Sequence, residues 1–311
     1  MILVLDDSLK KYSFPKHPFN STRYEEFVKE LKKELKDKKL NKRIKIIKAR
    51  KAKQKELLLF HTKSYVDFIK KKNKESRGFL DYGDTPAFEG CYEAGCYVVG
   101  AVLNAIDKMI ENKENAFVPI AGLHHAYHNR AAGFCIFNDV CIAINYLRKK
   151  YNKKKILYFD IDAHHGDGVF YSFLEDPEVY IVDFHQMPLY PGTGYENETG
   201  IGKAKGTKLN IVMKPFSTDS DFKNGLKRAE NFLSKLKADF IIFQAGADCL
   251  VNEPLANLTF EKAHEIAAKF LKKYAKEWKT NILALGGGGY NTKNCAKAWI
   301  CVVKNLITKM Q

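Results

Sequence analysis

The chain has 311 residues, of which 45% are hydrophobic and 13% aromatic, and 52 Lys and Arg against 36 Asp and Glu give a formal charge of +16. These fractions exclude a disordered or collagen-like chain and are typical of a globular protein with a large core. No run of about 18 apolar residues is present, so we expect no membrane-spanning helix. The acidic turn directly after Met1–Leu5 is not the pattern of a secretion signal.

Short apolar runs of β type alternate with segments of helical periodicity along the chain. The expected strands are Ile2–Leu5, Phe117–Ile120, Ile156–Ile161, Val179–Phe184, Lys208–Val212, Phe240–Phe243 and Ile282–Leu285. The expected helices are Tyr24–Lys36, Tyr92–Met109, Val140–Lys149, Asp221–Leu236, Phe260–Lys272 and Thr292–Ile307. This alternation predicts an α/β fold in which residues 1–311 form one domain, a three-layer sandwich. Its sheet is expected to be doubly wound and mostly parallel, with helices on both faces.

The cysteines indicate the redox compartment of the protein, and the lysines raise the question of nucleic-acid binding. The seven cysteines are odd in number and form no C-x-x-C pair, so neither a disulfide framework nor a cysteine-zinc site is expected. A reducing cytoplasm is the expected compartment. The basic excess is compatible with nucleic-acid binding, but the lysines of residues 27–36 alternate with glutamates at the spacing of a solvated helix face. No nucleic-acid recognition motif is present, so specific nucleic-acid binding is not expected.

Polar residues with metal-binding capacity follow the expected strands, where the ligand site of an open α/β sheet lies. Asp160, Asp162 and His164 alternate along the end of one strand and can therefore point the same way. Burying three such groups without a cation or mutual pairing would be costly. The tandem pair His124-His125 follows a second strand.

Two further segments extend this pattern. Asp248 lies just past the strand that ends at Phe243, and Gly286–Gly289 follow the last strand. A phosphate cradle would need a Lys-Ser/Thr that is absent here. The glycines are better explained by a close approach of the backbone and a sharp turn that presents Tyr290.

Eight motifs along nearly the whole chain occur in one order. They are His17-Pro18 with residues 58–66, Gly83–Gly90, His124-His125, Ala132–Asp139, Asp160–Gly168, Leu189–Gly194, Ala245–Asp248 and Gly287–Tyr290. Taken together they resemble the zinc-dependent histone deacetylase family, which includes the acetylpolyamine amidohydrolases. This resemblance implies the arginase/deacetylase-like α/β fold, which agrees with the sheet expected above. It also implies an enzyme that hydrolyses an amide bond.

The resemblance assigns the metal ligands and an oxyanion donor. Asp162, His164 and Asp248 match the zinc ligands, with iron(II) or cobalt(II) as alternatives to zinc. Three protein ligands leave room for water and substrate, as a catalytic zinc requires. Tyr290 matches the residue whose hydroxyl donates to the oxyanion, a contact worth about 3 kcal/mol of barrier.

The family pattern also assigns two histidine–carboxylate pairs. Asp160 would orient His124, and Asp167 would orient His125. A carboxylate on the far ring nitrogen fixes the tautomer of an imidazole and raises its basicity. By resemblance, His125 is the general base and proton shuttle, while His124 acts mainly through its charge.

The substrate path and a second cation site follow from the same matches. The residues implied at the substrate tunnel and its rim are Gly133, Phe134, Tyr190, Leu255 and Asp84. A family potassium site would lie near Asp160, Asp162 and His164, partly at backbone carbonyls, with Asp183 and Phe184 beside it. Asp183 departs from the family pattern, because many members carry serine there. The pairing of His185 is left open.

Three functions remain under comparison. The first is removal of an acyl group, foremost acetyl, from an aminoalkyl chain such as acetyl-lysine of a protein or a small acylated amine such as an acetylated polyamine. The second is an arginase-like hydrolase with two manganese ions, although Asp167 is displaced by one position from the arginase spacing. The third is a non-catalytic, basic protein associated with nucleic acid. The sequence does not define an oligomeric state.

Overall fold

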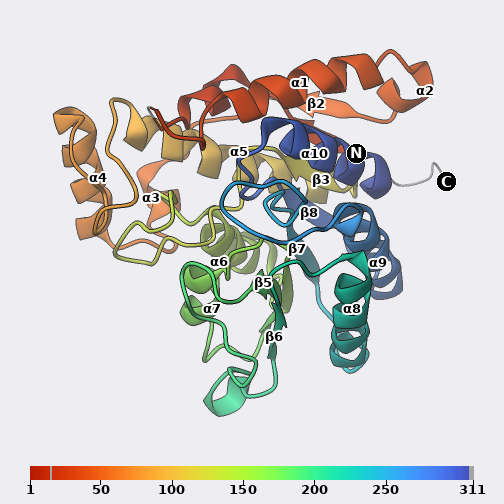
Figure 1. Ribbon diagram of the computed structural model, residues 1–311. Helices are drawn as coiled ribbons and strands as arrows, with labels where there is room; N and C mark the ends of the chain where they lie inside the picture. Colours follow the sequence, from red (N-terminus) through yellow and green to blue (C-terminus); the bar gives the residue numbers. More distant parts are fainter. Residues whose placement is uncertain (15, 308–311) are drawn as a thin grey trace.

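A computed structural model describes residues 1–14 and 16–307 (Figure 1). In this part of the chain, eight parallel strands form one sheet in the order β2-β1-β3-β8-β7-β4-β5-β6. The strands are β1 (Ile2–Val4), β2 (Lys45–Ile47), β3 (Ala116–Val118), β4 (Ile156–Asp160), β5 (Val179–Gln186), β6 (Lys208–Met213), β7 (Phe240–Gln244) and β8 (Ile282–Leu285). The predicted α/β class and parallel sheet are thus confirmed. The sequence did not predict β2, a three-residue edge strand with exposed Lys45 and Ile46 in a lysine-rich segment.

Helices cover both faces of the sheet. The α-helices are α1 (Thr22–Glu34), α2 (Lys38–Asn41), α3 (Gln54–Leu57), α4 (Lys63–Glu75), α5 (Cys91–Asn112), α6 (Asp139–Tyr151), α7 (Asp167–Ser172), α8 (Asp219–Leu233), α9 (Ala263–Trp278) and α10 (Thr292–Leu306). Helix α6 packs against α5 and α7, while α9 packs against α8 and α10, and α10 against α1. Figure 1 shows α6 and α7 on the opposite side of the sheet from α8 and α9.

Helix boundaries differ from the predicted ones where a cap decides them. The start of α8 was predicted at Asp221, but the helix begins at Asp219 after the N-cap Thr218. The Thr218 side chain accepts from the backbone of the first turn, and the Asp221 carboxylate accepts from Thr218 N at 2.7 Å. This reciprocal capping box satisfies backbone donors that the helix itself leaves unpaired.

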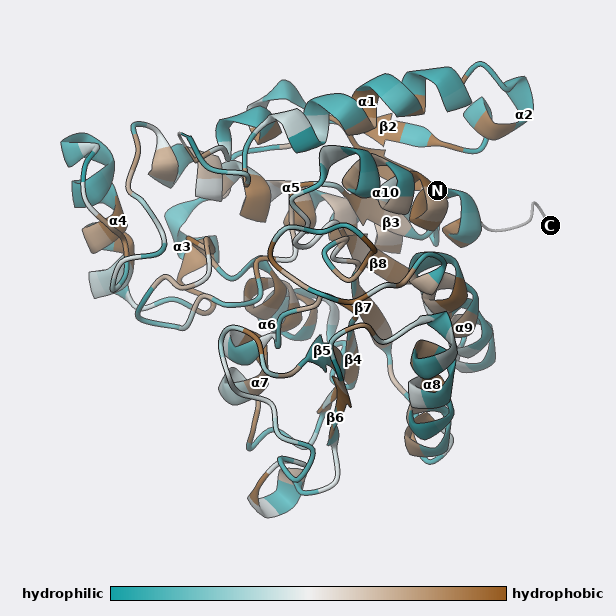
Figure 2. Cartoon of the chain, viewed as in Figure 1, coloured by the Kyte–Doolittle hydropathy of each residue, from teal (hydrophilic) through white to brown (hydrophobic). Residues whose placement is uncertain are grey.

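The central strands owe their position to their composition. Every residue of β4, β5 and β7 is buried, including the polar residues at their ends. A strand covered by helices on both faces gains most from apolar residues at every position. Figure 2 shows hydrophobic strands inside and hydrophilic outer faces on helices such as α1 and α8. Within residues 1–14 and 16–307, no helix combines the length and hydropathy that spanning a bilayer requires.

The sheet order determines where the polar residues meet. Strands β3, β8, β7 and β4 are consecutive neighbours, and all run in the same direction. The loops after their carboxyl ends therefore converge at one edge of the sheet. These loops carry the tandem histidines, the glycine run and the three candidate metal ligands.

Candidate active site

Two carboxylates and one imidazole converge beyond β4 and β7. In the described part of the chain, Asp162, His164 and Asp248 are the one group of His, Cys, Asp or Glu side chains arranged to hold a metal ion, with ligand atoms within 4.8 Å of one another. His164 Nδ1 lies 3.2 Å from Asp162 Oδ1 and 3.1 Å from Asp248 Oδ2. All three side chains are buried. Nitrogen and carboxylate oxygen are donors that zinc accepts in catalytic sites.

The charge of this cluster suits a cation. Burial, the largest effect, lowers the pKa of His164, but Asp162 and Asp248 raise it overall to about 10. Burial raises the pKa of Asp162, yet His124 and His164 together hold it well below its ordinary value. Two buried carboxylates beside one imidazole favour positive charge at the point where their oxygens meet. The donor set therefore fits a divalent metal ion.

The glycine run brings backbone against these carboxylates. Gly288 N donates to Asp162 Oδ2 at 2.8 Å, and Gln244 Nε2 donates to the same oxygen at 2.8 Å. A Cβ at Gly288 would lie 2.3 Å from Asp248 Oδ2, so any residue larger than glycine would clash with this carboxylate. The close backbone approach expected from the sequence is thus present, and Asp162 Oδ1 remains directed at His164.

The tandem histidines each have a carboxylate partner. His124 Nδ1 lies 2.8 Å from Asp160 Oδ2, and His125 Nδ1 lies 2.7 Å from Asp167 Oδ1. The two Nε2 atoms are 3.0 Å apart, which is within hydrogen-bond distance. Because each Nδ1 donates to a carboxylate, the Nε2 atoms are left to exchange protons with a reacting group.

Opposite pKa shifts distinguish the two rings. Burial lowers the pKa of His124, but the charges of Asp160 and Asp162 raise it overall to about 10. Burial and then the charge of His124 lower the pKa of His125 to about 4, against the opposing effect of Asp167. The imidazole pair thus holds its proton on His124 and leaves His125 neutral.

The loop that carries these histidines is held by hydrogen bonds to the start of α6. Asp139, the first residue of α6, accepts from Gly122 N at 2.8 Å and from Leu123 N at 2.7 Å. Its neighbour Asn138 caps α6 and donates to Ala126 O at 2.8 Å. These bonds join the helix start to both sides of the histidine pair.

Tyr290 closes the other side of a small cavity. The cavity is lined by the three candidate metal ligands and both histidines, and its volume of about 20 Å³ is room for about one water molecule. Glu253 Oε2 accepts from the backbone N of Tyr290 at 2.8 Å and of Asn291 at 3.1 Å. Glu253 Oε1 accepts from Asn294 Nδ2 at 2.9 Å, so the carboxylate ties Tyr290 to the start of α10.

A buried arginine that bonds to the glycine run was not predicted. The Arg23 side chain has no exposed surface, and Nη2 donates to Gly287 O at 2.6 Å. Its guanidinium stacks on Phe19 at 4.0 Å and lies 5.3 Å from Trp299. Nε and Nη1 have no hydrogen-bond partner. No sequence pattern pointed to Arg23: it lies just after the His17-Pro18 motif, in the first turn of the charged helix α1, but matches none of the motifs itself.

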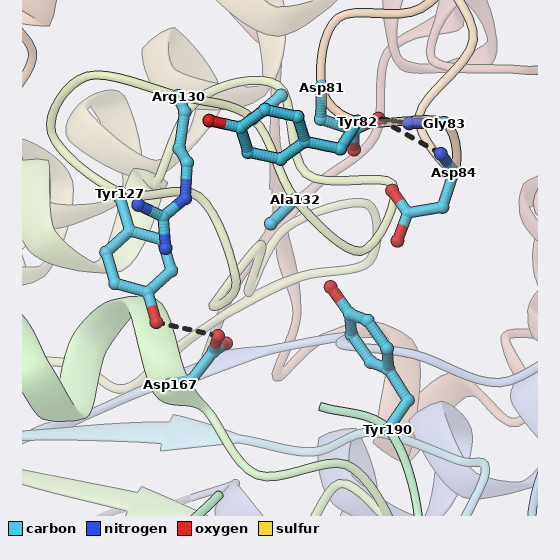
Figure 3. A pocket seen from close by; sticks show the side chains of 10 residues that line it. Asp81, Tyr82, Gly83, Asp84, Tyr127, Arg130, Ala132, Asp167 and Tyr190 are labelled. Atoms are coloured by element: carbon cyan, nitrogen blue, oxygen red, sulfur yellow. Dashed lines mark hydrogen bonds between the residues drawn. The ribbon is translucent and has the colours of Figure 1, made fainter. Parts of the chain in front are cut away.

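A wider pocket of about 400 Å³ opens beside the cavity (Figure 3). We call it the mouth pocket; it is lined by Asp81, Tyr82, Gly83, Asp84, Tyr127, Arg130, Ala131, Ala132, Asp167 and Tyr190. Tyr190 connects the two spaces, because its ring lies 5.2 Å from that of His125 and 6.4 Å from that of His164. Asp84 Oδ1 accepts from Thr85 Oγ1, whose oxygen in turn accepts from Phe134 N.

The structure brings most, not all, of the predicted substrate residues to these spaces. Gly133 lines the small cavity, and Asp84 and Tyr190 line the mouth pocket. Phe134 packs its ring 4.3 Å from His17 and 6.2 Å from Tyr290. Leu255 is 39% exposed and lines neither space.

Asp183 lies next to Asp160 on the neighbouring strand, and both are fully buried. Its Oδ1 lies 2.8 Å from His185 Nδ1, and its Oδ2 accepts from Gly166 N at 3.0 Å. His185 Nε2 lies 2.9 Å from Gly194 O, so the partners of this ring are now defined. Burial raises the pKa of Asp183, but the neighbouring histidines lower it overall, which keeps the carboxylate ionised.

The remaining contacts separate two of the hypotheses. Asp167 Oδ1 bonds His125 and Oδ2 accepts from Tyr127 Oη at 2.9 Å, so both oxygens have partners, and Asp167 is not a member of the candidate ligand group. An arginase-like centre would need such a carboxylate as a ligand of its second manganese. Within the described residues, one group of side chains is arranged so that it could hold a metal ion.

This arrangement defines a class of protein, an α/β fold whose sheet edge carries a buried Asp-His-Asp group that could hold a cation, next to two oriented imidazoles. Comparison with known protein families identifies the chain more closely. A family model described as the histone deacetylase domain matches residues 17–306. The chain belongs to the histone deacetylase family, whose members include hydrolases that act on amide bonds.

Similar proteins occur among bacteria and animals. The chain is 36% identical over 273 residues to "Acetoin utilization protein AcuC" of Bacillus subtilis (strain 168), covering 82% of this chain and 69% of that protein. It is 33% identical over 268 residues to "Histone deacetylase 8" of Xenopus laevis, covering 82% and 80%. The crystal structure of an HDAC homolog complexed with SAHA matches with a TM-score of 0.83 and 29% identity, covering 99% of this chain and 84% of that one.

Proposed function

We propose that this chain is a zinc-dependent amidohydrolase that removes an acyl group, foremost acetyl, from an aminoalkyl chain. Acetyl-lysine of a protein and a small acylated amine such as an acetylated polyamine are both substrates of this class. The observation that carries the proposal is the buried Asp162–His164–Asp248 cluster beside two imidazoles, each with its own carboxylate. The family membership supports the same reaction.

Asp162, His164 and Asp248 would hold the zinc, with iron(II) or cobalt(II) as alternatives. A zinc ion there would polarise the amide carbonyl and lower the pKa of water toward about 7. The geometric support is the convergence of one imidazole nitrogen and two carboxylate oxygens within 4.8 Å. Asp167 is occupied by His125 and Tyr127, which argues against a second, manganese-type site.

His125 would act as the general base and later return the proton to the leaving amine. Asp167 keeps the proton of His125 on Nδ1, so that Nε2 can accept one. His124, charged and paired with Asp160, would stabilise negative charge as it develops. Tyr290, which lines the same cavity, would donate its hydroxyl to the oxyanion.

The wider setting of the site adds two further proposals. We propose a potassium ion near Asp160, Asp162 and His164, supported by the paired buried carboxylates of Asp160 and Asp183 on adjacent strands. We also propose a cytoplasmic location, because all seven cysteines are free thiols and six of them are buried.

The test is acetate release by purified protein from an acetyl-lysine peptide and from N-acetylputrescine, with zinc, iron(II) or cobalt(II) supplied in turn. The Tyr290→Phe protein is the control for a contaminating hydrolase. We expect turnover that falls at least tenfold in the control. Absence of acetate release from every substrate with every metal would refute the proposal.

A further inference from the structure

The mouth pocket has walls of opposite charge. Asp81 and Asp84 form one wall, and Arg130 forms the opposite one (Figure 3). The pocket's volume of about 400 Å³ is in the range of pockets that bind small molecules. It joins the reacting centre at Tyr190 and Asp167, the second of which also bonds His125.

The acidic wall is shaped by its own backbone. Asp81 Oδ1 accepts from the backbone N of Gly83, Asp84 and Thr85, each at 3.0 Å. Its Oδ2 is buried, and the Asp81 and Asp84 carboxyls interact with each other. Burial and the adjoining Asp81 raise the pKa of Asp84 to about 6, so near neutral pH the two carboxyls together carry negative charge. A primary ammonium beside Asp84 would offset that charge and supply a donor.

The basic wall is a preorganised guanidinium. Arg130 stacks on the ring of Tyr127 at 3.7 Å, and Tyr127 N donates to Arg130 O at 2.9 Å. Tyr127 is itself held by its hydroxyl, which donates to Asp167 at 2.9 Å. No carboxylate in the described part of the chain pairs with the Arg130 guanidinium. A stacked arginine of this kind presents a fork that matches a carboxylate with two hydrogen bonds.

We infer that the mouth pocket selects a free α-amino acid acylated on its side-chain amine, such as Nε-acetyl-lysine, by binding its α-ammonium at Asp84 and its α-carboxylate at Arg130. This inference rests on the proposed function, because the acylated end must reach the cavity at His125 and Tyr290. An acetylated polyamine carries no carboxylate for Arg130. A lysine within a polypeptide carries neither charge at its α-carbon.

Tyr82 and Tyr190 complete this recognition. Tyr82 is fully exposed and lies across the mouth pocket between the two charged walls, and Tyr190 directs its hydroxyl toward Asp84 (Figure 3). Aromatic rings on either side of the path suit the methylene chain that links the head group to the acylated amine. The distance from Tyr190 to the candidate metal ligands therefore determines how many methylene groups the substrate can have.

The test compares three substrates with the same aminoalkyl chain: Nε-acetyl-lysine, its α-carboxamide and N-acetylcadaverine. The last is acetyl-lysine without the carboxylate. We expect kcat/KM to be at least tenfold higher for the free acid than for the other two. Arg130→Gln should remove this advantage, by lowering kcat/KM for the free acid about tenfold more than kcat/KM for the carboxamide or N-acetylcadaverine.

A matched control separates local recognition from net charge. Lys203→Gln removes one exposed positive charge that lines neither the cavity nor the mouth pocket, and should leave the preference unchanged. Equal kcat/KM for all three substrates, or an equal loss on all three in Arg130→Gln, would overturn this inference alone. Higher kcat/KM for an internal acetyl-lysine peptide than for the free acid would overturn it as well. No turnover of any substrate would overturn the proposed function itself.

Discussion

Gly133→Ala is a direct perturbation of the proposed general base. Gly133 has a φ of +54°, and a Cβ there would lie 2.3 Å from His125 Cδ2 and 2.7 Å from His125 Cγ. Carbon atoms in favourable contact are about 3.5–4.0 Å apart, so the ring must move by about 1 Å or more. A displacement of about 1 Å in a catalytic group can reduce the rate about 100-fold. We therefore expect kcat to fall about 100-fold.

The backbone strain of this substitution can be separated from the displacement of His125. Gly202 has a φ of +55° and nothing within 4 Å of its Cβ position. Gly202→Ala should therefore have the same conformational cost, about 1 kcal/mol, without touching the site. The assay is acetate release, with thermal unfolding and bound metal measured on both variants. If Gly133→Ala retains kcat within threefold of Gly202→Ala, the placement of His125 does not limit the reaction and the reasoning is wrong.

Three further predictions follow from the same geometry. Tyr290→Phe should lower kcat at least tenfold with bound metal unchanged, and unchanged turnover would exclude its hydroxyl from the reaction. Asp167→Asn should lower kcat/KM about 10- to 100-fold, because His125 Nδ1 loses its carboxylate acceptor, and a wild-type rate would contradict this role. Burial raises the pKa of Glu253 from 4.5 to about 7, so this group's contribution to folding is lost as the pH rises through about 4.5–7, by about 3 kcal/mol at most. Glu253→Gln should remove that dependence from unfolding free energies measured between pH 5 and 8, and an identical dependence in the variant would contradict the assignment.

The elements that the sequence predicted best are those whose environment is uniform. Fully buried runs such as Ile156–Asp160 and Phe240–Gln244 can hardly be anything but central strands, and the predicted boundaries differ by one residue. Strand β2 was missed because Lys45–Ile47 lies at the sheet edge and is largely exposed, so it shows no hydrophobic pattern. The local sequence pattern therefore predicts a strand that is fully buried. It does not predict an edge strand that is defined only by its pairing with a neighbouring strand.

In the candidate site, too, some residues could be predicted from local sequence pattern and others depend on long-range contacts. That Asp162 and Asp248 lie at the same edge of the sheet could be predicted, because each follows a strand and the carboxyl ends of parallel strands meet there. Their role as ligands comes from the family resemblance and stays a prediction. Arg23 and Glu253 could not, because their roles arise from contacts across long stretches of chain, as between Arg23 and Gly287. The partners of His185 depend in the same way on the loop that carries Gly194.

The central claim is that two aspartates and one histidine hold a single divalent metal ion. It is tested most directly by the metal content of the purified protein after dialysis, compared with Asp248→Ala. We predict one tightly bound zinc, iron or cobalt per wild-type chain and less than a tenth of that in the variant, because removing Asp248 leaves two ligands. Two metal ions per chain, or equal metal content in both proteins, would contradict the account.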